Sequence, residues 1–194
     1  MGKRGVYARR VVEKYIEQVK AGQIDDRTTQ YALDVVSGAI VAGKYVRAQA
    51  QRHISDLSRR DIKFDLSAAN FAIRFFPSVL TITAGEKAGA PFDLMPWQIF
   101  VVGSIYGWIS EDGYNRFKFI WLEMGKGQGK SPLMAGIAIY QLLSPKVKRP
   151  EIYCIGQNKQ TAKIPFKDIA SMCRSEIPHK NKSLAELKKV ILRG

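Results

Sequence analysis

The apolar residues at the start of the chain recur every three to four positions, which is the spacing of one helix face. Residues 5–21 place valine, tyrosine and isoleucine at this spacing among charged residues, which predicts an amphipathic helix ending near Gly22. The same period predicts a helix over 27–41, capped by Asp25 or Asp26, and another over 44–60. We therefore expect the chain to begin with a layer of packed helices.

A fourth helix is predicted over residues 66–76. Asp65 can cap it, because its carboxylate can accept hydrogen bonds from the N–H groups of the first turn. Pro77 is expected to interrupt the helix, since proline lacks the N–H that would continue the hydrogen-bond ladder. The bulky apolar residues of this helix are expected to lie in the core, namely Phe71, Ile73, Phe75 and Phe76.

The pattern changes near residue 80. Residues 80–83 alternate with β-branched side chains and predict a short strand, while 84–91 are rich in glycine, alanine and proline and predict a loop. We place a domain boundary here, which divides the chain into an N-terminal helical region at 1–83 and a second domain at 84–194.

Beyond the boundary the pattern predicts an apolar helix over 94–109, with Pro96 in its first turn, where the missing N–H costs little. Residues 110–115 are polar and predict a hairpin-like turn. Two apolar runs, 117–124 and 151–156, then predict buried strands.

Each predicted strand runs through a turn into a helical pattern, over 133–143 after the first and over 158–174 after the second. A last amphipathic helix is predicted over 184–192. This alternation indicates the α/β class, with a partial parallel sheet flanked by helices.

The chain has 194 residues, of which 46% are hydrophobic, enough to fill a core. Its 31 Lys and Arg outnumber 17 Asp and Glu, for a formal net charge of +14. Residues 1–60 hold 12 basic and 6 acidic side chains, 61–120 hold 5 and 6, and 121–194 hold 14 and 5. Two basic ends around a neutral middle favour a polyanion such as nucleic acid as partner.

The cysteines and histidines indicate neither a disulfide framework nor a metal site. Cys154 and Cys173 are far apart and lack metal-ligand spacing, and His53 and His179 are expected to be surface or capping residues. The N-terminus lacks the apolar stretch of a signal peptide, and no run is long enough to cross a bilayer. We expect a soluble, cytosolic chain that makes no membrane contact.

Residues 124–131 read MGKGQGKS and form the strongest candidate site. Glycines let a backbone fold around an anion, and the following helix offers the positive end of its dipole to the same phosphates. Lys130 would reach the β- and γ-phosphates of a nucleotide, and the hydroxyl of Ser131 would join the shell of Mg²⁺. The residues expected to hold the phosphates are Gly125, Lys126, Gly127, Gln128, Gly129, Lys130 and Ser131.

This stretch departs from the common pattern G-x-x-x-x-G-K-[ST], because Met124 stands where the first glycine is expected. We describe it as a deviant Walker A motif. The alternative is a surface turn rich in glycine and lysine that binds nothing. The predicted strand before it and helix after it favour the nucleotide site.

Several stretches together resemble the ATPase domain of tailed-phage terminase large subunits. They are FDLMPWQ at 92–98, YGW at 106–108, GYNRF at 113–117, the deviant Walker A motif and EIYCIG at 151–156. The early GKYV at 43–46 and QRHI at 51–54 also resemble the N-terminal helices of one branch of that family.

The resemblance implies roles for individual residues. The family's Pro-Trp-Gln segment carries a glutamine that contacts adenine, and this position is Gln98; an amide can both donate to and accept from a base edge. Trp97 either stacks or packs in the core. Lys126 occupies a position where family members often have an arginine, so it keeps the charge without the planar fork. Lys126 and Lys130 are thus the expected catalytic residues.

The resemblance also implies a P-loop NTPase of RecA-like fold that uses ATP and Mg²⁺. It implies the ATP-binding part of a viral motor that couples ATP hydrolysis to translocation of double-stranded DNA into a procapsid. The expected partners are DNA, the small terminase subunit, the portal protein and further copies in a homo-oligomeric ring, in the host cytoplasm.

The sequence departs from the family in one respect: no hydrophobic run ending in Asp-Glu follows Lys130, and no nuclease domain is found. We therefore expect an N-terminal piece of a larger motor. The alternative is a truncated, non-hydrolysing module that binds nucleotide or DNA or assembles with a partner. A small kinase or half of a helicase is a weaker possibility, without the carboxylates a kinase needs.

Overall fold

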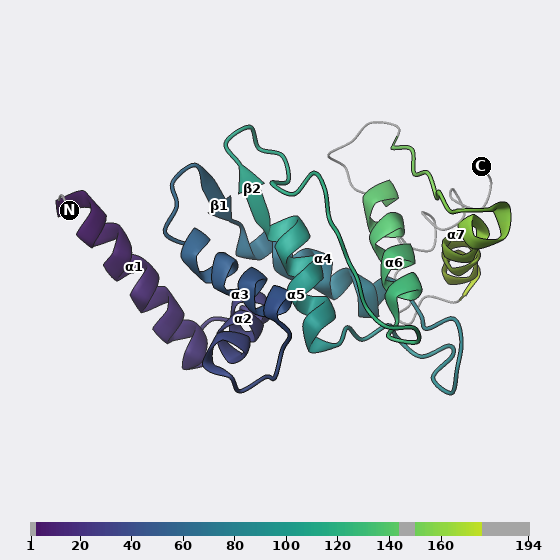
Figure 1. The fold of residues 1–194 in the computed structure, drawn as a ribbon, viewed down its shortest axis with the longest axis horizontal. Helices are drawn as coiled ribbons and strands as arrows, with labels where there is room; N and C mark the ends of the chain where they lie inside the picture. Colours follow the sequence, from purple (N-terminus) through teal and green to yellow (C-terminus); the bar gives the residue numbers. More distant parts are fainter. Residues whose placement is uncertain (1–2, 144–149, 176–194) are drawn as a thin grey trace. The chain divides into compact units, whose positions relative to one another are not determined.

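The computed structural model describes residues 3–143 and 150–175. The helix predicted over 184–192 and His179 lie outside the described residues. The elements, drawn in Figure 1, are α1 (Lys3–Lys20), α2 (Arg27–Ser37), α3 (Lys44–Asp56), β1 (Ile62–Phe64), α4 (Leu66–Val79), α5 (Pro96–Gly107), β2 (Trp108–Ser110), α6 (Lys130–Leu143) and α7 (Lys159–Arg174).

The chain forms two compact units, and each unit joins two separate stretches of sequence. The first comprises residues 1–73 and 95–120, and the second 74–94 and 121–194. These are packing units. The division into functional domains at residue 84 stays a prediction.

The helix predictions for the N-terminal region are confirmed, but α2 and α3 end earlier than predicted, α3 at Asp56 instead of residue 60. Asp26 caps α2, accepting from the Thr29 N–H at 2.9 Å. The helix ends at Ser37 instead of residue 41, because Gly38 takes the left-handed conformation (φ 87°), which favours glycine. Its N–H then bonds the Val35 carbonyl and closes the last turn.

Two predictions for α4 are wrong. Pro77 lies inside the helix, which continues to Val79; the Leu80 N–H bonds the Phe76 carbonyl at 2.8 Å and maintains the last turn. Phe71 was expected in the core but is 63% exposed. Phe75 and Phe76 are buried as expected. Phe71 shares a helix face with Phe75 but lies one turn earlier, so helical spacing alone does not account for its exposure.

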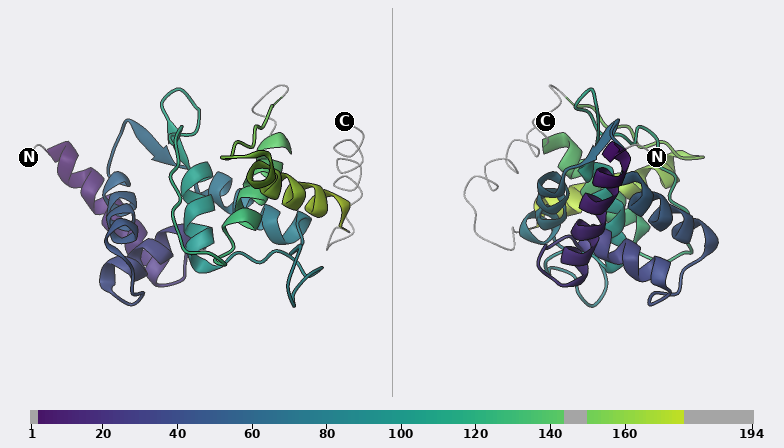
Figure 2. Two further views of the ribbon diagram at one scale, coloured as in Figure 1. Left: turned by 45° about the vertical axis from the view of Figure 1, so that its right-hand side comes forward. Right: turned by 90° about the vertical axis from the view of Figure 1, so that its left-hand side faces the viewer.

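The core of the first unit lies where α2 packs against α3 and α5, which Figures 1 and 2 show side by side. Tyr31 and Phe100 stack at 5.2 Å between ring centroids within this core. The backbones of α2 and α5 approach closely at Gly103, where an added Cβ would lie 1.9 Å from the Thr28 hydroxyl oxygen. Gly103 therefore sets the distance between these two helices.

His53 is buried, so its prediction as a surface or capping residue is wrong. The Trp108 indole N–H donates to its Nδ1 at 3.0 Å, and its Nε2 lies 2.9 Å from the Thr29 hydroxyl. The rings of Phe64, Phe100 and Trp108 meet the imidazole edge-on. Burial lowers the pKa of His53 to about 4, so the ring is neutral near pH 7.

The sheet differs from the prediction. The described residues hold one sheet of two antiparallel strands, β1 and β2, in which Lys63 is opposite Ile109. The polar turn after β2 is confirmed, with Gly113 at φ 79° and its N–H bonded to the Ser110 carbonyl. The α/β class holds, but the part of the chain that the structure describes contains no parallel sheet.

The strands predicted over 117–124 and 151–156 are not formed, and 80–83 contributes only an isolated bridge between Thr81 and Pro91. Phe119 is 96% exposed and Ile155 is 92% exposed. An apolar run becomes a strand only when a neighbouring segment pairs with its backbone. The run itself does not specify that neighbour.

The second unit contains α6 and α7, which pack together, and the end of α4 (Figure 2). Phe75 meets Tyr140 edge-on at 5.1 Å, and Phe76 meets Phe92 at 5.5 Å. The Thr81 hydroxyl donates to the Ser175 hydroxyl at 2.6 Å, which ties the end of α7 to the segment after α4.

Acidification should destabilise the first unit through His53. The unfolded histidine titrates near pH 6.5 and the folded one near 4, so stability is full above pH 6.5 and falls as the pH drops towards 4. The expected loss is about 3 kcal/mol, measured by urea unfolding followed by tryptophan fluorescence. His53→Gln keeps an acceptor and a donor but does not titrate, so it should show a shallower dependence on pH. If the unfolding free energy depends equally on pH in both proteins, His53 is not the group responsible.

Candidate functional site

The glycine-rich loop takes the backbone conformations that its sequence predicts. Residues 126–129 form a turn, in which Gly127 has φ 84° and Gly129 has φ 76°. Both values lie in the left-handed region, where a side chain would strain the backbone. The Leu133 N–H bonds the Gly129 carbonyl at 3.2 Å, so α6 starts directly from the turn. The predicted sequence of turn followed by helix is confirmed.

The predicted phosphate-binding residues lie together at the exposed start of α6. Lys126, Gln128 and Lys130 are exposed, and Ser131 is half-buried in the first helical turn. N–H groups in the first turn of a helix have no partner within that helix and carry partial positive charge. With the lysine ammonium groups they make this end of α6 suited to an anion.

The body of α6 is buried and holds the loop in place. Leu133, Ala135 and Ile139 have almost no exposure. At Gly136 an added Cβ would lie 2.4 Å from Phe76 Cε1, so α6 packs closely against the end of α4. The packed body of α6 thus begins directly after the glycine-rich turn.

The segment before the loop is extended without being a strand. Trp121 is 88% exposed, and its indole N–H donates to Glu123 at 3.3 Å. The predicted arrangement of strand, turn and helix is therefore found from the turn onwards. The aromatic residues that suggested a buried strand lie on the surface.

Gln98 has a role in the fold that its sequence prediction did not include. Its side chain is 3% exposed, and its amide oxygen accepts from the Met95 N–H at 2.8 Å at the start of α5. The signal was present, because Pro96 at the first helical position and a glutamine two residues later are typical of a capped helix start. Gln98 belongs to the first unit and the loop to the second, so its contact with adenine stays a prediction.

Trp97 is partly buried and packs against the core formed by Tyr31, Ala32, Val35, Ala50 and Phe100. Of the two interpretations of this residue, packing is the one that the structure supports.

The loop residues fit a nucleotide with its metal ion in part. Ser131 supplies a hydroxyl at the position where Mg²⁺ is coordinated in such loops. Among the described residues no three His, Cys, Asp or Glu side chains gather into a metal site. Glu123 and Asp168 are carboxylates of the same unit, and burial raises the pKa of Asp168 while a hydrogen bond with Thr83 opposes the rise.

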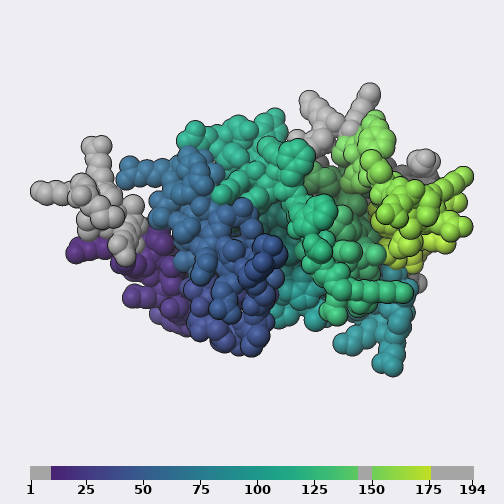
Figure 3. All heavy atoms as spheres, viewed as in Figure 1, coloured from purple at the N-terminus to yellow at the C-terminus, as the bar shows by residue number. Residues whose placement is uncertain are grey.

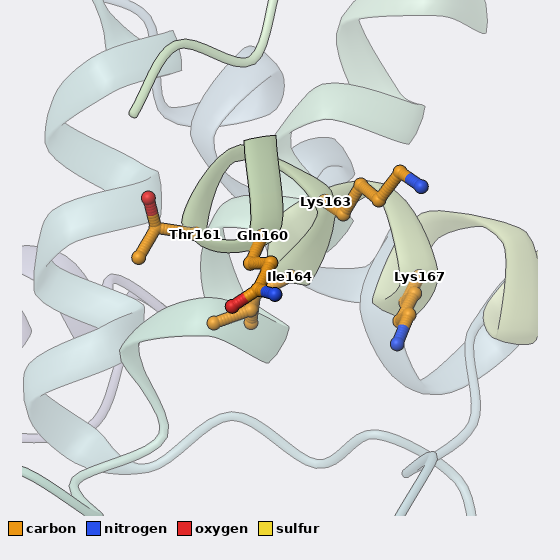
Figure 4. Close-up of a pocket in the computed structure, with 5 residues that line it drawn as sticks. All are labelled: Gln160, Thr161, Lys163, Ile164 and Lys167. Atoms are coloured by element: carbon orange, nitrogen blue, oxygen red, sulfur yellow. The ribbon is translucent and has the colours of Figure 1, made fainter. Parts of the chain in front are cut away.

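The second unit has a surface hollow whose lining residues are distant in sequence from the predicted nucleotide-binding residues. Figure 4 shows the described residues that line it, all of which belong to α7: Gln160, Thr161, Lys163, Ile164 and Lys167. None of the residues predicted to bind nucleotide lines it.

The chain matches one family model over residues 96–191, described as the terminase large subunit, ATPase domain. The matched region contains Gln98 and the whole glycine-rich loop. No curated protein and no solved structure matches the chain. Among the described residues, no helix is both long and apolar enough to cross a bilayer.

The glycine turn at the start of α6 and the family match together define this part of the chain as an ATPase domain. More specifically, residues 96–191 belong to the ATPase domain of terminase large subunits, which power DNA packaging. The predicted resemblance to this family is confirmed, and the family implies a P-loop fold and the use of ATP.

Adding a methyl group at Gly136 should destabilise the second unit. Gly136→Ala places a Cβ against Phe76, and overpacking of this kind typically costs about 1 to 3 kcal/mol. Phe76→Leu removes the ring edge that the Cβ meets, so Gly136→Ala should cost less in that background. The measurement is a double-mutant cycle of unfolding free energies. Strict additivity of the two changes would contradict the close approach.

Proposed function

We propose that this chain is the ATP-binding part of a motor that couples ATP hydrolysis to translocation of double-stranded DNA into a procapsid. The observation that carries the proposal is the turn at 126–129, with two glycines at positive φ before a buried helix, inside the region that matches the terminase family. A turn of this kind favours a phosphate chain over other anions, because several N–H groups can point at it at once.

The proposed roles follow from the positions of the residues. The backbone of Gly125, Gly127 and Gly129, together with the side chain of Gln128, surrounds the phosphates. Lys130 places its positive charge on the β- and γ-phosphates, and the Ser131 hydroxyl holds Mg²⁺. When bound, Mg²⁺ neutralises part of the phosphate charge and fixes the orientation of the phosphate chain.

Lys126 is the proposed second cation for charge that develops on the γ-phosphate. It is exposed and lies in the turn itself, four residues before Lys130. A lysine ammonium is a point charge on a flexible stem, whereas an arginine offers a planar pair of donors. We therefore expect Lys126 to support catalysis by charge alone, with less geometric control than arginine provides.

The proposed partners are double-stranded DNA, the small terminase subunit, the portal protein and further copies of the chain in a ring, in the host cytoplasm. The net charge of +14 supports DNA among these, because it attracts a polyanion without specifying a base sequence. The remaining partners rest on what motors of this family require.

Lys130→Ala should abolish most nucleotide binding, because it removes the cation proposed to contact the β- and γ-phosphates. A titration with a non-hydrolysable ATP analogue and Mg²⁺ measures the loss, expected at about tenfold or more. Lys163→Ala is the matched control, since Lys163 is an exposed lysine on α7 of the same unit. An affinity for Lys130→Ala within twofold of the unsubstituted chain would overturn the site.

Phosphate release on the same preparation separates a hydrolysing motor from a module that only binds. Turnover that Lys130→Ala removes supports the motor ATPase. Binding without turnover supports the non-hydrolysing alternative.

Gln98→Ala should weaken ATP more than inorganic triphosphate, because the proposal gives this side chain a contact with the base alone. It should also cost about 1 kcal/mol of unfolding free energy, since it removes the acceptor for the Met95 N–H. The two effects are separated by comparing affinities for ATP, GTP and triphosphate with urea unfolding curves. Equal losses for ATP and triphosphate would remove the adenine role and leave the capping role.

A further inference from the structure

One face of α3 consists of exposed polar side chains that can donate hydrogen bonds. Ala50, His53 and Asp56 turn into the first unit and are buried. The opposite face, here called the α3 face, is formed by Lys44, Arg47, Gln51, Arg52 and Ser55, all exposed. Helical periodicity brings these five residues to one side, because they recur at intervals of three and four. Atoms of this part of the chain reach the surface in Figure 3, where they are coloured blue.

The α3 face carries no carboxylate. Asp56 is the one acidic residue between positions 44 and 60. It is buried, and two arginines pair with its carboxylate. Arg116 binds its Oδ2 at 2.6 Å, and Arg59 lies 3.4 Å from its Oδ1. The positive charge of Lys44, Arg47 and Arg52 is therefore not balanced on the surface that presents it.

Arg52 is held in position while its charge remains available. Its guanidinium lies over the Phe117 ring at 4.9 Å from the centroid, and the Arg116 guanidinium approaches the same ring at 5.1 Å. Arg52 makes no ion pair within the described residues. Burial and the nearby Arg116 lower its pKa, and the carboxylate of Asp56, which binds Arg116, partly opposes this shift. Without a direct carboxylate contact, the Arg52 guanidinium can donate hydrogen bonds to an external anion.

The dimensions of the α3 face suit a nucleic acid backbone. From Lys44 to Arg52, the outermost cations of the α3 face, the helix rises about 12 Å, which is close to the width of about 12 Å of the major groove of a duplex. These cations can therefore reach phosphates on both sides of a groove. Tyr45 is exposed beside this face, and the Lys44 ammonium lies 4.8 Å from the centroid of its ring. The five side chains of the face itself are polar, unlike the aromatic and large aliphatic residues that anchor protein interfaces.

We propose that the α3 face binds the phosphate backbone of double-stranded DNA without reading its sequence. The inference rests on the proposed function in one respect, namely that DNA is the polyanion such a motor moves. The surface itself is separate from the glycine-rich loop and lies in the other unit. Phosphate contacts position a protein on DNA and carry no sequence information.

The test compares two triple variants of equal charge in the full chain. Lys44→Gln, Arg47→Gln and Arg52→Gln remove the cations of the α3 face. Lys159→Gln, Lys163→Gln and Lys167→Gln remove three exposed lysines of α7. Affinity for a fluorescent duplex of random sequence is measured by anisotropy over a range of salt concentrations.

The α3 variant should bind the duplex about tenfold more weakly and lose about 2 to 3 units from the slope of log affinity against log salt. The α7 variant should stay within twofold with an unchanged slope. Equal losses of duplex affinity in both variants would show that only the net charge matters, and they would contradict the proposal that the α3 face binds DNA. So would tighter binding of polyglutamate than of the duplex, which would indicate an acidic protein as partner.

Two measurements keep the result interpretable. Arg47→Gln alone changes an exposed side chain and should lower the salt slope by about one unit, even if the triple variant folds poorly. Binding of the ATP analogue to each variant tests the proposed function independently. If the unsubstituted chain binds the duplex but not the nucleotide, the proposed motor function is wrong and the proposal that the α3 face binds DNA still stands. An unsubstituted chain that binds nucleotide but no duplex would overturn the α3 face.

Discussion

In each of the two units a glycine sets how closely two helices can pack. Gly103 brings α5 against Thr28 of α2, and Gly136 brings α6 against Phe76 of α4. At both positions a single methyl group would occupy space already filled by a neighbour, so the helices would have to move apart. The core of the first unit and the anchoring of the glycine-rich loop in the second both depend on these close approaches.

The loop and its helix illustrate how a binding site is divided between a backbone that must bend and a body that must not. Gly127 and Gly129 supply the bend, and the buried residues of α6 supply the rigidity. Lys126 lies in the exposed turn and Lys130 at the first position of α6, directly before the buried part of that helix. In the proposed function such a loop would bind phosphate largely through main-chain N–H groups, so it would need few specific side chains.

The sequence predicted the local features of this chain well and the non-local ones poorly. The helices were predictable because the residues that set their periodicity and caps, such as Asp26 for α2, lie within a few residues of each other. The glycine turn was predictable because its residues are contiguous. The strands at 117–124 and 151–156 were not, because pairing depends on segments distant in sequence.

Structural roles that the sequence analysis missed have the same explanation. His53 looked like a surface residue because its partners, Thr29 and Trp108, are 24 and 55 positions away. For Gln98 the capping contact was missed, although Pro96 and the helix start indicated it, and its contact with adenine stays a prediction. Pro77 shows the converse, since the helix continues past a residue at which local rules predict its end.

The buried hydrogen bonds around His53 form a series in which each group donates to the next. Trp108 can only donate to Nδ1, so the neutral imidazole carries its proton on Nε2 and donates it to the Thr29 hydroxyl. Tyr15 in turn donates to Asp26 at 2.6 Å, and Thr29 hydrogen bonds with Tyr15. The bond dipoles from the indole to the carboxylate are thereby aligned head to tail, and each bond polarises the next. A continuous series of hydrogen bonds therefore connects the carboxylate that caps α2 with the Trp108 indole in β2, through α1 and α3.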